Sequence, residues 1–204
     1  MFKKLDYDFY SQTDVVKLAR LLIGKVLVTK WEGIETSGRI IETEAYNGVI
    51  DKASHAWNGR RTARTEIMYG DAGSAYVYLC YGIHHLFNVV TNSKDTPHAI
   101  LIRAIEPLTG IDTMLKRTGK KKNDHTLGSG PGNVSKALGL FTKHSGLTLL
   151  NDEVFIVDDG FKAVNKDILA TPRIGVDYAG EDASLPYRFI LKNNPHLSAK
   201  RYNL

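Results

Sequence analysis

The sequence predicts a single domain of the α+β class, and three observations support this prediction. A chain of 204 residues suits one compact domain with a substantial core. Several apolar segments alternate with a period of two or form short continuous runs, as strands do, whereas few show helical spacing. No internal repeat, low-complexity segment or clear domain boundary divides residues 1–204.

Composition narrows the class of protein before any motif is considered. Hydrophobic content of 43% and charged content of 24% are those of an ordinary soluble globular protein. No apolar run approaches the length of a membrane span, and the N-terminus lacks the apolar core of a signal peptide. The single Cys80 excludes an internal disulfide and a cysteine-cluster metal site, so we expect a cytoplasmic protein. The net charge of +5 mildly favours a polyanionic partner.

The first elements are one helix and two strands. Thr13–Gly24 has a polar N-cap candidate, apolar residues at helical spacing and a terminal glycine, which predicts a helix that serves as scaffold. Lys25–Lys30 predicts a strand that turns at Trp31–Gly33. A second strand is expected over residues 37–46.

The second strand carries two acidic residues. Alternation places Glu42, Glu44 and Tyr46 on one face. A glutamate in a strand is usually solvated or half of an ion pair, because burying it unpaired costs stability. The aromatic residue on the same face and the turn at Gly48 favour a carboxylate in a pocket.

A long segment without regular periodicity follows, from Asn47 to Gly73. Long irregular segments inside compact domains are more often functional or disordered than mere connections. Arg60, Arg61 and Arg64 lie between aromatic residues here, a pattern typical of phosphate contacts beside stacking groups. Surface arginines that only confer solubility remain an alternative interpretation.

Residues 76–90 predict a β-hairpin that turns at Gly82. A period of two places Tyr76 and Tyr78 on one face of the first strand, and Tyr81 falls at the turn. Two interpretations of Tyr81 stay open. It packs beneath another loop, the commoner case for an aromatic, or it is a wedge that enters a flat object such as a stack of bases.

Ala99–Pro107 predicts an almost wholly apolar strand that carries one charged residue in its interior, Arg103. A buried arginine requires an anion. Glu42 or Glu44 on a neighbouring strand would serve, either as a purely structural ion pair or as a pair that positions a catalytic carboxylate.

The remaining segments are shorter. Gly110–Arg117 predicts a helix, and the glycine-rich turn Gly128–Asn133 precedes a second helix whose free amides could face an anion. Strands are expected at Val154–Val157 and Tyr187–Leu191.

Seven segments occur in an order that indicates a family. They are Ile41–Tyr46, Ala53–His55, Tyr76–Gly82 with Asn88, Leu101–Pro107, Ser129–Leu138, Pro172–Val176 and Pro186–Phe189. As an ordered set they resemble the alkyladenine (3-methyladenine, N-methylpurine) DNA glycosylase family, in the short form without the N-terminal tail of the mammalian enzyme. The resemblance extends from about Leu18 to Ser198. It implies an α+β domain built on a curved antiparallel sheet, with flanking helices and a protruding β-hairpin.

The resemblance also implies an activity, the excision of damaged purines from double-stranded DNA. Glu44 would be the general base that activates the attacking water, and Arg103 would hold that water and the carboxylate. The backbone near Ile174–Val176 would lie at the water site. No lysine matches a motif position suited to a Schiff base, so we expect a monofunctional enzyme that leaves an abasic site.

The resemblance assigns further roles around the base. Tyr46, His55 and Tyr78 would form the pocket that sandwiches a flipped base, and Asn88 would exclude guanine by crowding its exocyclic amino group. Tyr81 would be the wedge that fills the gap in the duplex. Substrates would include alkylated purines such as 3-methyladenine, with hypoxanthine and ethenoadenine as candidates. We expect a monomer without cofactor or metal, nucleoid-associated if the source is bacterial.

Three other classes of protein are considered. A helix-hairpin-helix glycosylase is suggested by Gly130–Gly132, but strand patterns dominate the chain. A catalytically silent module that binds damaged DNA or RNA would not need Glu44 together with Arg103. A metal-dependent nuclease could use Glu42 and Glu44 and would lose activity in EDTA, which we do not expect here.

Overall fold

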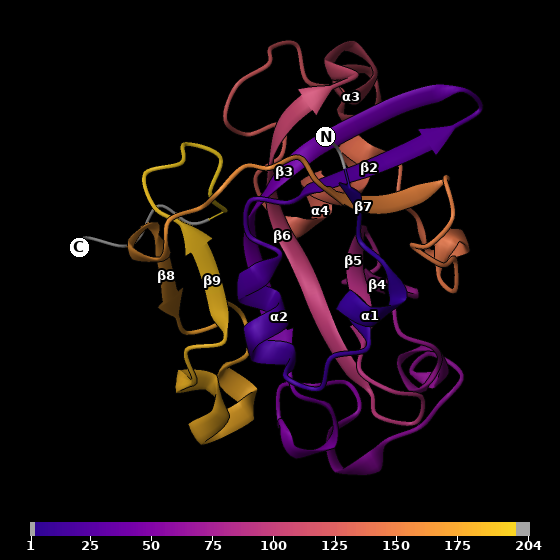
Figure 1. The fold of residues 1–204 in the computed structure, drawn as a ribbon, viewed down its shortest axis with the longest axis vertical. Coiled ribbons are helices and arrows are strands. Elements are labelled where there is room, and N and C mark those ends of the chain that lie inside the picture. Colours follow the sequence, from indigo (N-terminus) through magenta and orange to yellow (C-terminus); the bar gives the residue numbers. More distant parts are fainter. Residues whose placement is uncertain (1–2, 199–204) are drawn as a thin grey trace.

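The computed structural model describes residues 3–198, which form one antiparallel sheet with helices packed on it (Figure 1). The strands are β1 (Lys3–Lys4), β2 (Val26–Trp31), β3 (Ile34–Tyr46), β4 (Ala75–Cys80), β5 (His84–Thr91), β6 (His98–Thr109), β7 (Val154–Asp158), β8 (Ile168–Thr171) and β9 (Arg188–Leu191). The main path of the sheet runs β1-β7-β2-β3-β6-β5-β4, and β9 pairs with both β3 and β8. The expected α+β class and antiparallel sheet are confirmed, and β1 and β8 were not predicted.

The helices are short. They are α1 (Tyr7–Tyr10), α2 (Val15–Leu21), α3 (Ile111–Thr118) and α4 (Pro131–Leu138), with 3-10 turns η1 (Gly48–Ile50), η2 (Trp57–Gly59), η3 (Glu66–Tyr69), η4 (Thr142–His144), η5 (Asn165–Asp167) and η6 (Asp177–Ser184). The first predicted helix begins later than expected because Asp14, not Thr13, caps it by accepting a bond from the amide of Lys17. Across residues 3–198, the helices are all too short or too polar to cross a membrane.

The central strands β3 and β6 depart from regular pairing where they carry charge. The register pairs Ile40 with Ile105 and Glu42 with Ala104, then Thr43 with Ile102. The pairing therefore skips Ile41 in β3 and Arg103 in β6, so each strand has one bulge. Bulges redirect side chains, and the bulge in β6 turns Arg103 toward the acidic residues of β3.

Two ribbons share one edge of β3. Its first half pairs with β2, and Glu42–Glu44 pair with β9 (Figure 1). This branch places Arg188 of β9 opposite Glu44 in the register and next to the carboxylate of Glu42. Arg188 is fully buried, so charged side chains lie in the interior of the protein where β3 changes its partner from β2 to β9.

Alternation along the strands separates the core from the opposite face. Val77, Phe87, Val89, Ile100 and Ile102 belong to the hydrophobic core, which α2 and α4 cover. Their sequence neighbours face the other way and line a cavity: Tyr76, Tyr78, Asn88, Leu101 and Arg103. The period of two thus assigns one face of the sheet to stability and the other to a site.

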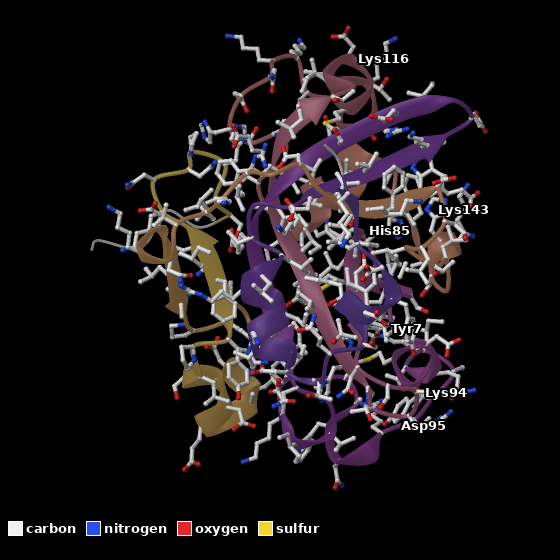
Figure 2. All side chains as sticks on the ribbon, in the orientation of Figure 1. Tyr7, His85, Lys94, Asp95, Lys116 and Lys143 are labelled. Atoms are coloured by element: carbon white, nitrogen blue, oxygen red, sulfur yellow. The ribbon has the colours of Figure 1, made fainter. Side chains whose placement is uncertain are left out.

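The predicted hairpin is confirmed as β4 and β5. Its turn has positive φ at both Tyr81 (50°) and Gly82 (73°), which fits the twist of a tight hairpin. The segment between Asn47 and Gly73 contains no strand and only three 3-10 turns within the described residues, as expected. Charged side chains surround the molecule, and Lys94 and Lys116 lie at opposite ends of it (Figure 2).

Candidate active site

The sheet face opposite the helices holds a cavity of about 680 Å³. This volume is within the range of small-molecule sites and exceeds what one purine needs. Its walls include residues from the hairpin, from β6, from the irregular segment and from the stretch before η6. The lining residues include Tyr46, His55, Arg64, Tyr76, Tyr78, Cys80, Tyr81, Asn88, Arg103, Gly132, Ile174 and Tyr178.

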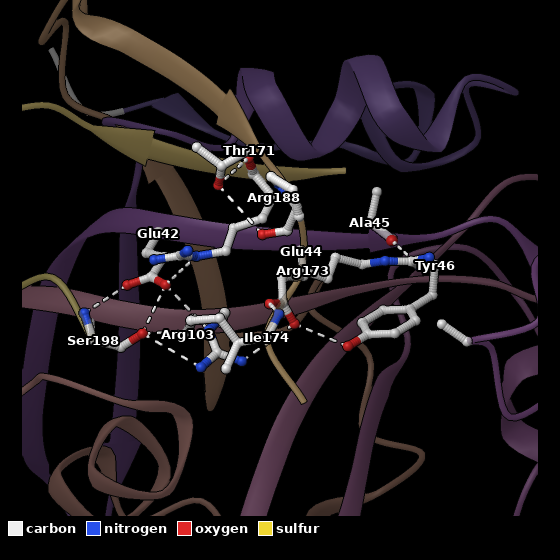
Figure 3. A network of polar contacts seen from close by, with 12 residues as sticks. Glu42, Glu44, Ala45, Tyr46, Arg103, Thr171, Arg173, Ile174, Arg188 and Ser198 are labelled. Carbon is white, nitrogen blue, oxygen red and sulfur yellow. Dashed lines mark hydrogen bonds and ion pairs between the residues drawn. The ribbon is translucent and has the colours of Figure 1, made fainter. Parts of the chain in front are cut away.

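Glu44 lies directly behind the wall of this cavity. Its side chain is fully buried, and it accepts three hydrogen bonds from the described residues; all three donors line the cavity (Figure 3). The amide of Ile174 donates to Oε1 at 2.8 Å. The Tyr46 hydroxyl (2.9 Å) and Nη1 of Arg103 (3.3 Å) donate to Oε2. These three contacts hold the carboxylate of Glu44 in one orientation against the cavity wall.

Arg103 links the two glutamates of β3. Its Nε lies 3.1 Å from Oε1 of Glu42, and its Nη1 lies 3.3 Å from Oε2 of Glu44 (Figure 3). Burial acts to lower the pKa of Arg103, but the carboxylates of Glu44 and Glu42 outweigh it and raise that pKa above its ordinary value. The expectation that Arg103 pairs with one of the two acids is confirmed, and it pairs with both.

Glu42 is the centre of a second set of contacts. Nε of Arg188 donates to its Oε1 at 2.6 Å, as does the hydroxyl of Ser198 at 2.7 Å, and the amide of Ser198 donates to Oε2 at 2.7 Å (Figure 3). No role was predicted for Arg188 or Ser198 from the sequence. Arg188 is the first residue of the otherwise apolar strand β9, and this was the one signal that could have indicated a buried ion pair.

The aromatic residues that were expected to surround a base form one wall of the cavity. Nδ1 of His55 lies 2.9 Å from the hydroxyl of Tyr76, and the rings of His55 and Tyr78 meet edge to face at 4.7 Å. Tyr76 and Tyr78 have centroids 5.4 Å apart. Burial, followed by the charge of Glu44, raises the pKa of Tyr46 well above its ordinary value, so its hydroxyl keeps its proton. Tyr46, His55 and Tyr78 line the same cavity, together with Tyr76, which had no assigned role.

The three arginines of the irregular segment do not gather in one place. Nη2 of Arg64 lies 3.0 Å from Nε2 of His55, and its guanidinium carbon lies 4.8 Å from the centre of the Tyr78 ring. Arg61 instead bonds to Glu66 and Asp95, and Asp95 lies at one end of the molecule (Figure 2). Arg60 is exposed. Arg64 is therefore part of the cavity, whereas Arg61 already has two carboxylate partners.

The hairpin tip stands free of the rest of the protein. Tyr81 is 89% exposed, so the interpretation that another loop covers it is wrong. Tyr178, which also lines the cavity, is 71% exposed, although its hydroxyl bonds to the carbonyl oxygen of Ala53 at 3.2 Å. Asn88 is buried deeper in the cavity and donates from Nδ2 to the carbonyls of Tyr76 and Leu86.

A buried ion pair holds the two irregular segments that complete the site. Arg173 bonds to both oxygens of Asp51 and to the carbonyl oxygens of Ala45 and Asp182. Asp51 also accepts bonds from the amides of its own loop, at Asn47 and Ala53. This pair anchors the stretch that carries Ile174 to the loop that carries His55, and the sequence analysis did not anticipate it.

The described residues contain no group of three histidine, cysteine or acidic side chains arranged to hold a metal ion. His84 and His85 point to opposite faces of β5, as alternation predicts. His84 contacts Gly132, whereas Nδ1 of His85 accepts a bond from the amide of Thr142.

An aromatic cavity with a buried glutamate behind its wall and an exposed tyrosine at its rim is typical of enzymes that act on an extruded nucleobase. Comparison with known proteins makes this class specific. Residues 8–195 match the family model described as Methylpurine-DNA glycosylase (MPG). The chain belongs to this family of DNA glycosylases, and the resemblance drawn from the sequence motifs is confirmed.

Three bacterial relatives cover almost the whole chain, and each bears the name "Putative 3-methyladenine DNA glycosylase". The protein of Chlamydia felis is 49% identical over 92% of this chain and 95% of its own length. That of Bacillus cereus is 45% identical over 94% and 97%. That of Clostridium perfringens (strain 13 / Type A) is 41% identical over 97% and 100%.

Proposed function

We propose that this protein excises alkylated purines such as 3-methyladenine from double-stranded DNA by hydrolysing the N-glycosidic bond. The observation that carries the proposal is Glu44, a buried carboxylate held by three donors immediately behind an aromatic cavity. Membership of the methylpurine-DNA glycosylase family and the names of the relatives support the same substrate class.

The substrate base must leave the duplex before it can enter the cavity. Extrusion costs a few kcal/mol, and less for a damaged or mispaired base. Tyr81, exposed at the tip of the hairpin, fills the space that the base vacates and stacks on its former neighbours. The extruded purine lies between Tyr46, His55 and Tyr78. An alkylated purine is often cationic, so it stacks well against tyrosine rings and a neutral imidazole.

The chemical step breaks the bond between C1′ of the sugar and the purine nitrogen. A water molecule forms the new bond to C1′ and gives its proton to Glu44, while the electron pair of the broken bond stays with the purine. A cationic alkylated purine thereby departs as the neutral free base, and the DNA retains an abasic site. The developing oxocarbenium ion is cationic, so the charge of Glu44 also stabilises the transition state. Arg103 and the amide of Ile174 keep the carboxylate in position.

Other residues set specificity and binding. Asn88 crowds the exocyclic amino group of guanine and so excludes the normal base. Arg60, Arg61 and Arg64 contact the DNA backbone, which requires Arg61 to leave its carboxylate partners and Arg64 to leave the cavity. We further propose a cytoplasmic monomer that needs no cofactor, with hypoxanthine and ethenoadenine as additional substrates.

The test compares the wild-type protein with Glu44→Gln on end-labelled duplexes in EDTA, with and without hot alkali. One duplex contains hypoxanthine, and methylated DNA supplies 3-methyladenine. We expect alkali-dependent cleavage by the wild type, and a rate about 10²–10⁴-fold lower for Glu44→Gln with lesion binding retained. Glu35→Gln on the same strand, where Glu35 pairs with Lys30 at the surface, is the matched control and should be fully active.

Three results would overturn parts of the proposal. Substantial turnover by Glu44→Gln would assign the base to another residue. Cleavage without alkali would contradict a monofunctional enzyme. Lesion binding without release of either base would support the silent binding module instead.

A further inference from the structure

We infer that Glu42 and Ser198 form a positioning unit for the reaction, in which the segment 194–198 holds Glu42 and Glu42 sets Arg103 against Glu44. Neither residue touches the substrate in this scheme. The inference rests on the proposed role of Glu44 and extends it to the C-terminal part of the chain.

The hydrogen bonds to the two glutamates assign them different tasks. Glu42 receives four bonds from the described residues, from Arg103, Arg188 and twice from Ser198. The described residues donate three bonds to Glu44, and all three donors line the cavity. Of the donors to Glu42, only Arg103 lines it. Glu44 is therefore the carboxylate placed to act in the cavity, and Glu42 is its support.

The segment that delivers Ser198 is tied to the body of the protein. Asn194 donates from Nδ2 to Glu106 of β6 at 3.0 Å and caps the following turn by accepting a bond from the amide of His196. The hydroxyl of Ser129, in the glycine-rich turn before α4, donates to the carbonyl oxygen of Leu197 at 2.9 Å. These contacts bring Ser198 to Glu42, which lies 156 positions earlier in the chain.

Glu42 also controls the charge that Glu44 experiences. Arg103 is shared between the two carboxylates, and Arg188 bonds to Glu42. If Glu42 is neutralised, the positive charge of Arg103 is no longer shared between two carboxylates and acts on Glu44 alone. The positive charge of Arg188, which Glu42 no longer balances, adds to it. The added positive potential favours ionised Glu44 and makes it a poorer proton acceptor. Excision should then slow, and the acid limb of its pH profile should move to lower pH.

The first experiment measures single-turnover excision of hypoxanthine as a function of pH for wild type, Glu42→Gln and the control Glu35→Gln. For Glu42→Gln we expect a rate about tenfold lower near neutral pH, because the loss of one hydrogen bond to a charged group corresponds to about that factor. We also expect unchanged lesion binding and an acid limb displaced to lower pH. An acid limb at the wild-type position would overturn the inference, whether or not the rate falls, because a merely structural role lowers the rate at all pH values alike.

A second set of variants covers the case in which Glu42→Gln does not fold, since removal of one buried charge can be strongly destabilising. Ser198→Ala removes the hydroxyl that bonds to Glu42, and Ser198→Thr retains one. We expect Ser198→Ala to be about threefold to tenfold slower with unchanged binding, and Ser198→Thr to be within about twofold of wild type. Ser11→Ala, at an exposed hydroxyl, is the control. Equal rates for the two Ser198 variants would contradict the inference.

A measurement that does not depend on activity separates this inference from the proposed function. The amide of Ser198 should be protected from hydrogen exchange in the wild type because it donates to Glu42. Ser198→Ala removes the hydroxyl bond between residue 198 and Glu42. Because only the amide bond then holds this residue to the carboxylate, the amide at position 198 should exchange about tenfold faster. If the wild-type enzyme releases no damaged purine, the proposed function fails, yet protection at this amide still supports the contact. An unprotected wild-type amide would overturn the inference even if excision is robust.

Discussion

At the scale of the single residue, His55 shows how a histidine is kept neutral in the wall of a cavity. Burial lowers the pKa of His55 to about 4, and the nearby charges of Arg64 and Arg60 add to the effect. A neutral imidazole can accept a hydrogen bond from Arg64 or form one with the hydroxyl of Tyr76. It also does not repel a cationic purine. Arg60 and Arg64 therefore reinforce the effect of burial on the charge state of His55.

This pKa predicts a dependence of stability on pH. The unfolded chain takes up a proton on histidine near the ordinary value of 6.5, whereas folded His55 resists protonation until about 4. Stability is therefore lost as the pH falls from about 6.5 to about 4, and His55 has no further effect below that window. From pH 7 to pH 5, the free energy of unfolding in urea should fall by about 1–2 kcal/mol more for wild type than for His55→Phe. Equal losses in the two proteins would contradict this assignment.

At the scale of the element, the β4–β5 hairpin exposes apolar side chains at its tip. Tyr81 and Ile83 are 89% and 70% exposed at its tip, a costly use of apolar surface unless a partner covers it. The strands of the hairpin are fixed by β6 and by η4, so the tip projects from a firm base. Tyr81 also has a positive φ, which a bulky residue adopts only under strain. The element thus presents one aromatic ring to whatever lies opposite the cavity.

The hairpin is tested by Tyr81→Ser. If the ring stacks in the duplex, the dissociation constant for a lesion duplex should rise about 5- to 150-fold, equivalent to about 1–3 kcal/mol. Fluorescence anisotropy with labelled duplex measures this change. The matched control is Ile34→Ser, which removes an exposed apolar side chain from the hairpin of β2 and β3. It should leave binding unchanged. Unchanged binding and single-turnover excision in Tyr81→Ser would rule out the wedge.

At the scale of the whole molecule, the site is assembled from segments that lie far apart in the chain. Arg173 and Asp51, 122 residues apart, join the loop that carries His55 to the stretch that carries Ile174. The guanidinium of Arg173 also lies 5.0 Å from the Tyr46 ring centre and 5.3 Å from that of Tyr187. Loss of this ion pair should therefore affect stability and the cavity together.

Asp51→Asn tests that coupling. It leaves the buried guanidinium of Arg173 without its carboxylate, and the free energy of unfolding should fall by about 3–5 kcal/mol. Excision should slow as well, because Ile174 and His55 lose their common anchor. Asp152→Asn makes the same change in an exposed pair with Lys4 and should alter neither quantity measurably. Similar stabilities for the two variants in urea would contradict the role given to Arg173.

Much of the architecture could be predicted because it depends on local pattern. Period-two segments identified β3 and the hairpin of β4 and β5. An almost wholly apolar run identified β6, and the single Arg103 inside it indicated a buried ion pair. The strands that escaped prediction, β1 and β8, are two and four residues long. Segments this short carry too little periodicity to be recognised, and they form only because a partner strand is already in place.

The sequence by itself determined the antiparallel strands, the family, the hairpin with Tyr81 at its tip and the face that carries Glu42, Glu44 and Tyr46. Only the tertiary structure decided that Arg103 bonds to both glutamates, and that the described donors to Glu44 line the cavity whereas Arg188 and Ser198, which bond to Glu42, do not. It also decided that Arg64 lies in the cavity, that Arg61 already has acidic partners, and that Ser198 reaches Glu42. The physical reason is that strand pattern and turn chemistry act between neighbours in the chain. Hydrogen bonds to a buried carboxylate depend on bulges, strand branching and loop anchors that bring together residues more than a hundred positions apart.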